Sequence, residues 1–149
     1  MTMNNRLERN RSGEAGFTLL EILLVVIIIS MLVGVAVVNL MPKVAESKKT
    51  AAQDQIHNYG AALDLYYLDS GILPTTEQGL QALIAAPTST PVPGNWKGPY
   101  LNPPILRKDP WGHDYIYQNP GTHNPSSYDL SSPGPDGIPG NEDDVGNWQ

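Results

Sequence analysis

The C-terminal segment of the chain is rich in carboxylates and glycine. Residues 132–144 read SPGPDGIPGNEDD, with acidic side chains at Asp136, Glu142, Asp143 and Asp144 among the glycines. Calcium takes about six to eight oxygen ligands from carboxylates and backbone carbonyls, and glycines let a loop wrap around such an ion. The EF-hand spacing is missing. The segment therefore predicts either a calcium loop of another kind or a solvated acidic tail.

Two features favour the calcium loop over the solvated tail. The chain carries Trp148 next to its end, and disordered tails rarely carry an apolar residue of this size. The chain also has no cysteine, so no disulfide pins the C-terminal loop. Another interaction has to hold it.

A second candidate for chemistry is one carboxylate inside an apolar run. Between residues 17 and 41 the only polar residues are Thr18, Glu21, Ser30 and Asn39. A helix of this length reaches about 37 Å at about 1.5 Å per residue. The hydrocarbon core of a bilayer is roughly 30 Å thick. The run therefore predicts a transmembrane helix.

The N-terminus fits three descriptions to different degrees. A secretory signal peptide has an apolar region of about 7–15 residues, which is shorter than this run. A plain signal anchor fits the length. An anchor that is cut before its apolar run fits as well, because the string GFTLLE at residues 16–21 follows a short charged leader.

Charge excludes one large class of function. The chain carries a net charge of -6, and residues 1–16 contribute three arginines against two glutamates, so the rest carries -7. No cluster of Lys and Arg is present to displace counterions from phosphates, which argues against nucleic-acid binding. An acidic domain suits metal cations. Residues 42–149 are enough for one small domain.

The elements that must position these residues begin with a second helical stretch. Between residues 43 and 70 apolar side chains recur every three or four positions, which predicts an amphipathic continuation of the apolar helix. These side chains are Ala52, Ile56, Tyr59, Leu63 and Tyr66. Pro42 is expected to kink the helix or remove a hydrogen bond, and Gly71 to end it.

The remaining pattern predicts a short helix and a small sheet. PTTEQGLQALIAAP at residues 74–87 has the capping-box spacing, with Thr75 as N-cap and Gln78 three residues later. KDPWG at residues 108–112 predicts a type I turn. The stretches 114–119 and 126–132 predict two antiparallel strands. The predicted fold class is α+β: a long N-terminal helix, a short second helix, a small antiparallel β-sheet and a C-terminal loop.

The sequence offers few other candidates for metal-binding or catalytic residues. The histidines have no cysteine partners and no metal-binding spacing, so we expect them on the surface or on a helix: His57, His113 and His123. The serines and Asp129 close to His123 resemble neither a nucleophile elbow nor an oriented base. The sequence predicts no enzyme.

The stretch GFTLLE behind a charged leader resembles the type III leader of type IV pilins and pseudopilins. In that family a membrane peptidase cuts after the glycine and N-methylates the new terminal residue. The resemblance implies cleavage after Gly16, a mature terminus at Phe17 and an assembly role for Glu21. Cutting creates an amine within one helical turn of Glu21, which can pair with it or with a neighbouring subunit's amine. Alternatively, Glu21 merely lies at the headgroup level.

Three further blocks are LPTTEQGLQAL, KDPWGHDY and PGPDGIPGNEDDVGNW. They resemble signature blocks of the major pseudopilins of type II secretion systems. This resemblance implies a structural subunit of a helical homopolymer that drives the export of folded proteins across the outer membrane. It implies a cleaved leader (1–16), a single-pass inner-membrane and assembly helix (17–41) and a periplasmic domain (42–149). The implied partners are other copies of the chain, the prepilin peptidase/N-methyltransferase, minor pseudopilins, the inner-membrane secretion platform and the lipid bilayer.

The resemblance also implies a single calcium ion. Its ligands would be the side chains of Asp136, Asp143 and Asp144 and the carbonyl oxygens of Pro133 and Ile138. Two alternatives remain open: a membrane-anchored periplasmic domain with calcium-dependent binding, and a type IV pilus subunit. Loss of residues 1–16 from the membrane-extracted protein, with one added methyl group, distinguishes a pseudopilin from the tethered binding domain.

Overall fold

The computed structural model describes the backbone of residues 17–149 and the side chains of all of these except residues 35–40. The predicted leader, with Gly16, lies outside the described residues. The chain divides into two units, residues 1–41 and 42–149. The predicted proline position is therefore also the boundary between the units.

One helix, α1, runs through Leu19–Ser70 and includes Pro42. Its first turn is closed by Thr18, whose hydroxyl and carbonyl oxygens accept from the Glu21 amide at 3.2 Å and 3.0 Å. Its end is the predicted one: Gly71 adopts a φ of 74°, and its amide donates to the carbonyl of Tyr67 at 2.8 Å. A left-handed residue at this position terminates the helix at little steric cost only when it is glycine.

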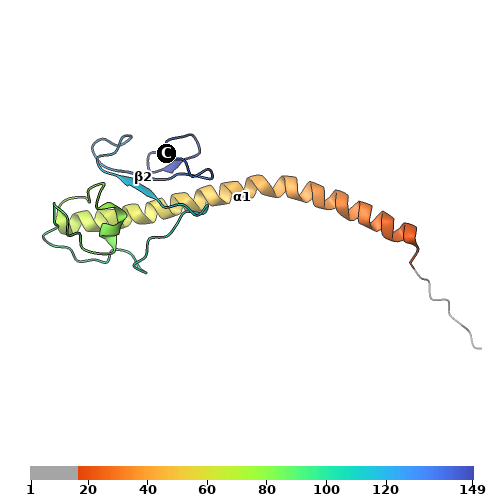
Figure 1. The fold of residues 1–149 in the computed structure, drawn as a ribbon, viewed down its shortest axis with the longest axis horizontal. Coiled ribbons are helices and arrows are strands. Elements are labelled where there is room, and N and C mark those ends of the chain that lie inside the picture. The colour runs from red at the N-terminus through yellow and green to blue at the C-terminus, as the bar shows by residue number, and fades with distance from the viewer. Residues whose placement is uncertain (1–16) are drawn as a thin grey trace, which may run out of the picture. The chain divides into compact units, whose positions relative to one another are not determined.

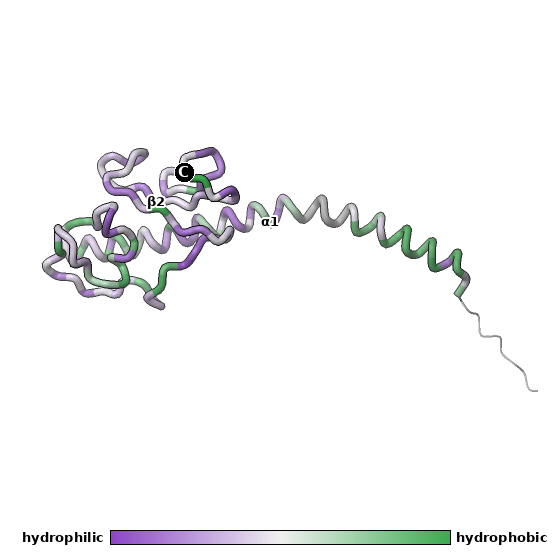
Figure 2. The backbone as a smooth tube through the Cα atoms, in the orientation of Figure 1, coloured by the Kyte–Doolittle hydropathy of each residue, from purple (hydrophilic) through white to green (hydrophobic). Residues whose placement is uncertain are grey.

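The start of α1, from Leu19 to Val33, is apolar and exposed. Figure 2 shows this apolar character at the start of the helix. The large apolar side chains from Leu19 to Val33 are each between 45% and 87% exposed. Within the part of the chain that the structure describes, no helix meets the length and hydropathy needed to cross a membrane.

The second unit has its core on one face of α1. The predicted apolar positions, from Ala52 to Tyr66, are all buried. They pack with buried side chains contributed by later segments: Leu80, Leu83, Tyr117, Leu130 and Val145. In Figure 1 the strand β2 lies against the yellow part of α1. The amphipathic prediction is confirmed.

The second helix is a short 3-10 helix, η1, Gly79–Leu83, and not the longer α-helix that the capping box suggested. The capping box itself forms: the Gln78 amide donates to the Thr75 hydroxyl at 3.2 Å, and the Thr75 amide donates to Gln78 Oε1 at 3.1 Å. Gly79, the first residue of η1, takes a φ of 57°, outside the range of right-handed helices. The backbone therefore changes conformation between the capped turn and the rest of η1, and no continuous α-helix forms.

The sheet has three antiparallel strands in the order β1-β2-β3. They are β1 Ile116–Gln118, β2 Asp129–Ser132 and β3 Val145–Gly146. Tyr117 pairs with Leu130, and Ser132 pairs with Val145. Two of these strands match the predicted stretches, whereas β3 was not predicted.

Candidate metal loop and N-terminal segment

The acidic segment forms a loop between two paired strands. It leaves β2 at Ser132 and enters β3 at Val145, and these two residues face each other in the antiparallel register. Pro133 and Asp144 are the next residues on either side, so the ends of the loop are held together. We call residues 133–144 the acidic loop.

Asp144 is the most buried carboxylate of the acidic loop, with 6% of the residue exposed. Its Oδ2 accepts from the Gly140 amide at 2.7 Å. Its Oδ1 is buried and has no hydrogen-bond partner in the described part of the chain. A buried carboxylate oxygen without a partner is costly, and a bound cation is one of the arrangements that satisfy it.

Asp143 lies directly against the start of the same loop. A Cβ on Gly134 would meet the Asp143 carbonyl group, and it would lie 3.2 Å from the Asp143 carboxylate Oδ2. Gly134 also has a φ of 68°, which favours glycine on its own. Asp143 therefore lies directly beside Gly134.

The Asp136 carboxylate accepts hydrogen bonds from residues of its own loop. Its Oδ1 accepts from the Ile138 amide at 2.8 Å, and its Oδ2 accepts from the Asn141 side-chain amide at 2.8 Å. Ile138 is 62% exposed. Across residues 17–149, no group of three or more His, Cys, Asp or Glu side chains is close enough to hold a metal ion. In the described loop the three carboxylates contact different residues: Asp136 contacts Asn141, Asp143 lies beside Gly134, and Asp144 accepts from Gly140.

A turn from another part of the chain supports the acidic loop. The predicted type I turn is present: the Gly112 amide donates to the Asp109 carbonyl at 3.0 Å. Asp109 is buried, and its Oδ2 accepts from the Ser132 hydroxyl at 2.5 Å. Burial alone would raise the pKa of Asp109, but hydrogen bonds from Ser132 and from the His113 and Trp111 amides outweigh it and hold the pKa below its ordinary value.

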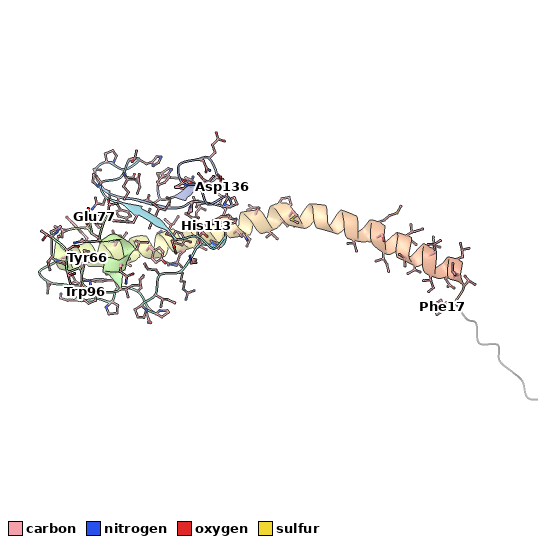
Figure 3. All side chains as sticks on the ribbon, viewed as in Figure 1. Phe17, Tyr66, Glu77, Trp96, His113 and Asp136 are labelled. Atoms are coloured by element: carbon pink, nitrogen blue, oxygen red, sulfur yellow. The ribbon has the colours of Figure 1, made fainter. Side chains whose placement is uncertain are left out.

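His113, predicted as a surface residue, is half-buried. Its Nδ1 lies 2.9 Å from the carbonyl oxygen of Gly134. Figure 3 labels His113 on its turn and Asp136 on the loop beside it. The Ser132 hydroxyl donates to Asp109 and is fully buried, so Ser132, His113 and Asp109 form a structural network and not a nucleophile with its base.

His123 and Asp129 are also structural. The Asp129 carboxylate accepts from the amides of Thr122, His123 and Asn124 and lies 3.1 Å from His123 Nδ1. The His123 ring stacks on Trp148 with centroids 3.8 Å apart. These contacts fasten the end of the chain to the loop that precedes β2, which agrees with the prediction that Trp148 is not part of a disordered tail.

Phe17 and Glu21 lie at the start of the described chain. Phe17 is 77% exposed, and Glu21 is exposed in the first turn of α1. No cation of residues 17–149 forms an ion pair with Glu21. A carboxylate in this position gains from the helix dipole and is open to a partner outside the described residues.

Two family models match the chain. One is described as "Type II secretion system (T2SS), protein G" and matches residues 39–148. The other is described as "Prokaryotic N-terminal methylation motif" and matches residues 11–37, a range that includes Gly16, Phe17 and Glu21.

Curated relatives agree with these models. The type II secretion system core protein G of Escherichia coli strain K12 is 46% identical over 141 residues, covering 94% of this chain and 94% of the relative. The protein of the same name from Pectobacterium carotovorum subsp. carotovorum is 45% identical over 136 residues, covering 91% of this chain and 85% of the relative.

A solved structure is similar as well. The crystal structure of the major pseudopilin from the type 2 secretion system of enterohaemorrhagic Escherichia coli is 42% identical, with a TM-score of 0.66. The match covers 74% of this chain and 94% of that chain. The small sheet and the two helices described above therefore match the fold of a solved protein.

Proposed function

Because this chain belongs to the protein G family of type II secretion systems and is a structural subunit of their pseudopilus, we propose that it polymerises through its N-terminal helix. Growth of the polymer would push folded proteins toward and across the outer membrane. The family is one of structural subunits and not of enzymes. Its N-methylation motif implies processing by the prepilin peptidase and assembly with other secretion components.

Processing would occur between Gly16 and Phe17. The motif match spans both residues, and the first helical turn begins only two residues later, at Leu19. The peptidase, acting also as N-methyltransferase, would leave a methylated amine on Phe17. A terminal amine is largely cationic in water at neutral pH.

The observation that carries the assembly proposal is the uncovered apolar part of α1 with one exposed carboxylate in its first turn. Apolar side chains in this number need lipid or protein around them. Before assembly we place residues 17–41 in the inner membrane and residues 42–149 in the periplasm. In the polymer the same side chains pack against neighbouring subunits.

Glu21 would set the register of that packing. In an apolar surrounding, a charged carboxylate is tolerated only with a partner, and the amine of Phe17 on the neighbouring subunit supplies one. A buried polar pair penalises every alignment in which the two charges fail to meet. Minor pseudopilins and the inner-membrane platform, the other proposed partners, would present the first such surface to the growing polymer.

We further propose that the acidic loop binds one calcium ion. Asp136, Asp143 and Asp144 would contribute carboxylate oxygens, and Pro133 and Ile138 carbonyl oxygens. The buried, unpartnered Oδ1 of Asp144 supports this proposal, as does the approach of Asp143 to Gly134. The donor set is all oxygen, which calcium prefers. Bound calcium supplies a link between the two ends of the loop. Asp136 would exchange its hydrogen bond with Asn141 for the ion.

Intact-mass measurement of the protein extracted from membranes tests the assembly proposal. The expected mass lacks residues 1–16 and includes one methyl group. A mature mass that retains the leader would instead favour a plain membrane anchor that carries a binding domain. Recovery of the protein in long surface pili, without any defect in secretion when it is deleted, would favour a type IV pilus subunit.

A further inference from the structure

We propose that His113 is a positioning residue for the acidic loop, and that together with Asp109 and Ser132 it sets the affinity of that loop for calcium. The inference rests on the calcium binding proposed above and extends it to residues outside the loop. None of the three is a proposed ligand. Each acts by holding the backbone on which the ligands are carried.

His113 holds the loop through Gly134. The Gly134 carbonyl oxygen can only accept a hydrogen bond, so His113 Nδ1, at 2.9 Å, carries the proton and donates it. The Gly134 amide donates to the Ser132 hydroxyl at 3.2 Å. Gly134 is therefore held at both its amide nitrogen and its carbonyl oxygen, and it is the residue that Asp143 approaches.

Asp109 contacts both residues that hold Gly134, His113 and Ser132. Its Oδ1 accepts from the His113 amide at 2.7 Å, and its Oδ2 accepts from the Ser132 hydroxyl at 2.5 Å. One buried carboxylate thus fixes both the histidine and the serine that contact Gly134. Hydrogen bonds to a charged acceptor in a buried position are stronger than neutral ones.

The imidazole ring of His113 also packs against the acidic loop at Gly137. A Cβ on Gly137 would lie 2.8 Å from His113 Nε2 and 3.1 Å from its Cε1. Gly137 has a φ of 73° and stands between two proposed ligands, Asp136 and Ile138. The ring therefore contacts the backbone at residues 134 and 137, beside the start of the loop and beside Asp136.

Such contacts lower the cost of binding the ion. A loop whose backbone is already held loses less conformational entropy when its oxygens gather around a cation. Residues that orient metal ligands from outside typically change affinity by about 10-fold to 100-fold when they are removed. We expect an increase of about tenfold or more in the calcium dissociation constant of the His113→Ala variant.

Calorimetric titration of the full chain in detergent micelles with calcium chloride tests the inference. The variants are His113→Ala, His113→Asn and Ser132→Ala. Asparagine keeps a donor near the position of Nδ1 and loses the contact with Gly137, so its dissociation constant should lie between those of the wild type and His113→Ala. His57→Ala, which changes an exposed histidine on α1, should bind as the wild type does.

Two further measurements distinguish a positioning role of His113 from a merely structural one. Thr76→Ala should lower the melting temperature without changing the dissociation constant, because the Thr76 hydroxyl forms its hydrogen bonds with the backbone of Asn119 and not with the acidic loop or the Asp109 turn. Hydrogen exchange at residues 134–137 without calcium should be faster in His113→Ala than in the wild type. If the wild type binds calcium and His113→Ala binds it equally well, the positioning role is wrong and calcium binding stands. If the wild type binds no calcium, both proposals are wrong.

Discussion

The hydroxyl of Tyr59 makes two hydrogen bonds with one residue of a distant loop. It donates to the carbonyl oxygen of Arg107 at 3.1 Å and accepts from the amide of Arg107 at 2.7 Å. The Tyr59 ring is buried on α1, and it meets Tyr115 edge-on with centroids 5.4 Å apart. This contact joins the helix to the segment that leads into the Asp109 turn.

Tyr59→Phe should destabilise the domain by about 1 kcal/mol, since the loss of a hydrogen bond typically costs about 0.5–1.5 kcal/mol. The loss is kept small because Arg107 is exposed and water can replace the hydroxyl. Thermal unfolding followed by circular dichroism measures it. The matched control is Tyr67→Phe, an exposed tyrosine of the same helix, which should melt as the wild type does. Equal melting of the two variants would contradict the role of the Tyr59 contact.

Asp109 should make the domain sensitive to acid. Its hydrogen bonds hold its pKa below the ordinary value of about 3.9. A group whose pKa is lower in the folded state contributes stability above the unfolded-state pKa, and this contribution is lost as pH falls through the folded-state pKa. The melting temperature of the wild type should therefore fall below about pH 4. The Asp109→Asn variant should have a lower melting temperature at neutral pH, and this temperature should fall less on acidification.

The control for acid sensitivity is Asp114→Asn. The side chain of Asp114 is 84% exposed and pairs with Lys108 at 3.2 Å on the surface. Surface pairs contribute little to stability. This variant should follow the wild-type pH profile. If Asp109→Asn also follows it, the buried network does not depend on the charge of Asp109.

Gly134 and Gly140 allow a matched comparison within the acidic loop. Both have positive φ, 68° and 93°, but only a Cβ on Gly134 would meet another group, the carbonyl and carboxylate of Asp143. Gly140→Ala should cost about 1 kcal/mol from backbone strain alone. Gly134→Ala should cost more and should also weaken calcium binding, because Asp143 has to move. Equal effects of the two substitutions, measured by unfolding and calcium titration, would contradict the close packing.

Much of this architecture could be predicted because it depends on local periodicity. The apolar spacing from Ala52 to Tyr66 and the left-handed stop at Gly71 both occurred as the sequence indicated. The strand β3 could not be predicted, since Val145–Gly146 is too short to show alternation and depends on pairing with Ser131 and Ser132. The length of η1 was overestimated because apolar spacing alone does not reveal the left-handed Gly79.

The candidate site was predictable as a segment but not as a structure. The acidic composition located the loop, yet the support from Asp109 and His113 joins residues more than twenty positions apart. Contacts of this separation leave no periodic signal. The aspartate at the first position of the DPWG turn was the one local clue, since such a side chain caps its own turn and has an oxygen left for a distant donor.

Glu21→Ala should block assembly without blocking membrane insertion or leader cleavage. Removing a charge makes the apolar segment more apolar, so insertion should persist, whereas the polymer loses the partner of the Phe17 amine. Cysteine crosslinking between neighbouring subunits measures polymer formation, and the intact mass reports cleavage. Glu46→Ala, which removes an exposed carboxylate farther along α1, should assemble as the wild type does. Normal polymerisation of Glu21→Ala would show that the carboxylate is not needed for register.

Calcium should stabilise the folded chain through the acidic loop. Binding to the folded state alone adds about 2.7 kcal/mol when calcium is at about 100 times its dissociation constant. That is a large share of the roughly 5–15 kcal/mol typical of a domain, so chelation should lower the melting temperature by several degrees or more.

Asp144→Asn removes the charge of the carboxylate that carries the unpartnered Oδ1, and it can keep the acceptor for the Gly140 amide. Without calcium this variant should be at least as stable as the wild type, because a buried charge is gone. With calcium it should gain nothing. Glu142→Gln, an exposed change in the same loop, should keep the full calcium response. Differential scanning calorimetry of the full chain in detergent, with calcium and with chelator, makes the comparison. A wild type that melts at one temperature in both conditions would show that the loop is a solvated acidic segment.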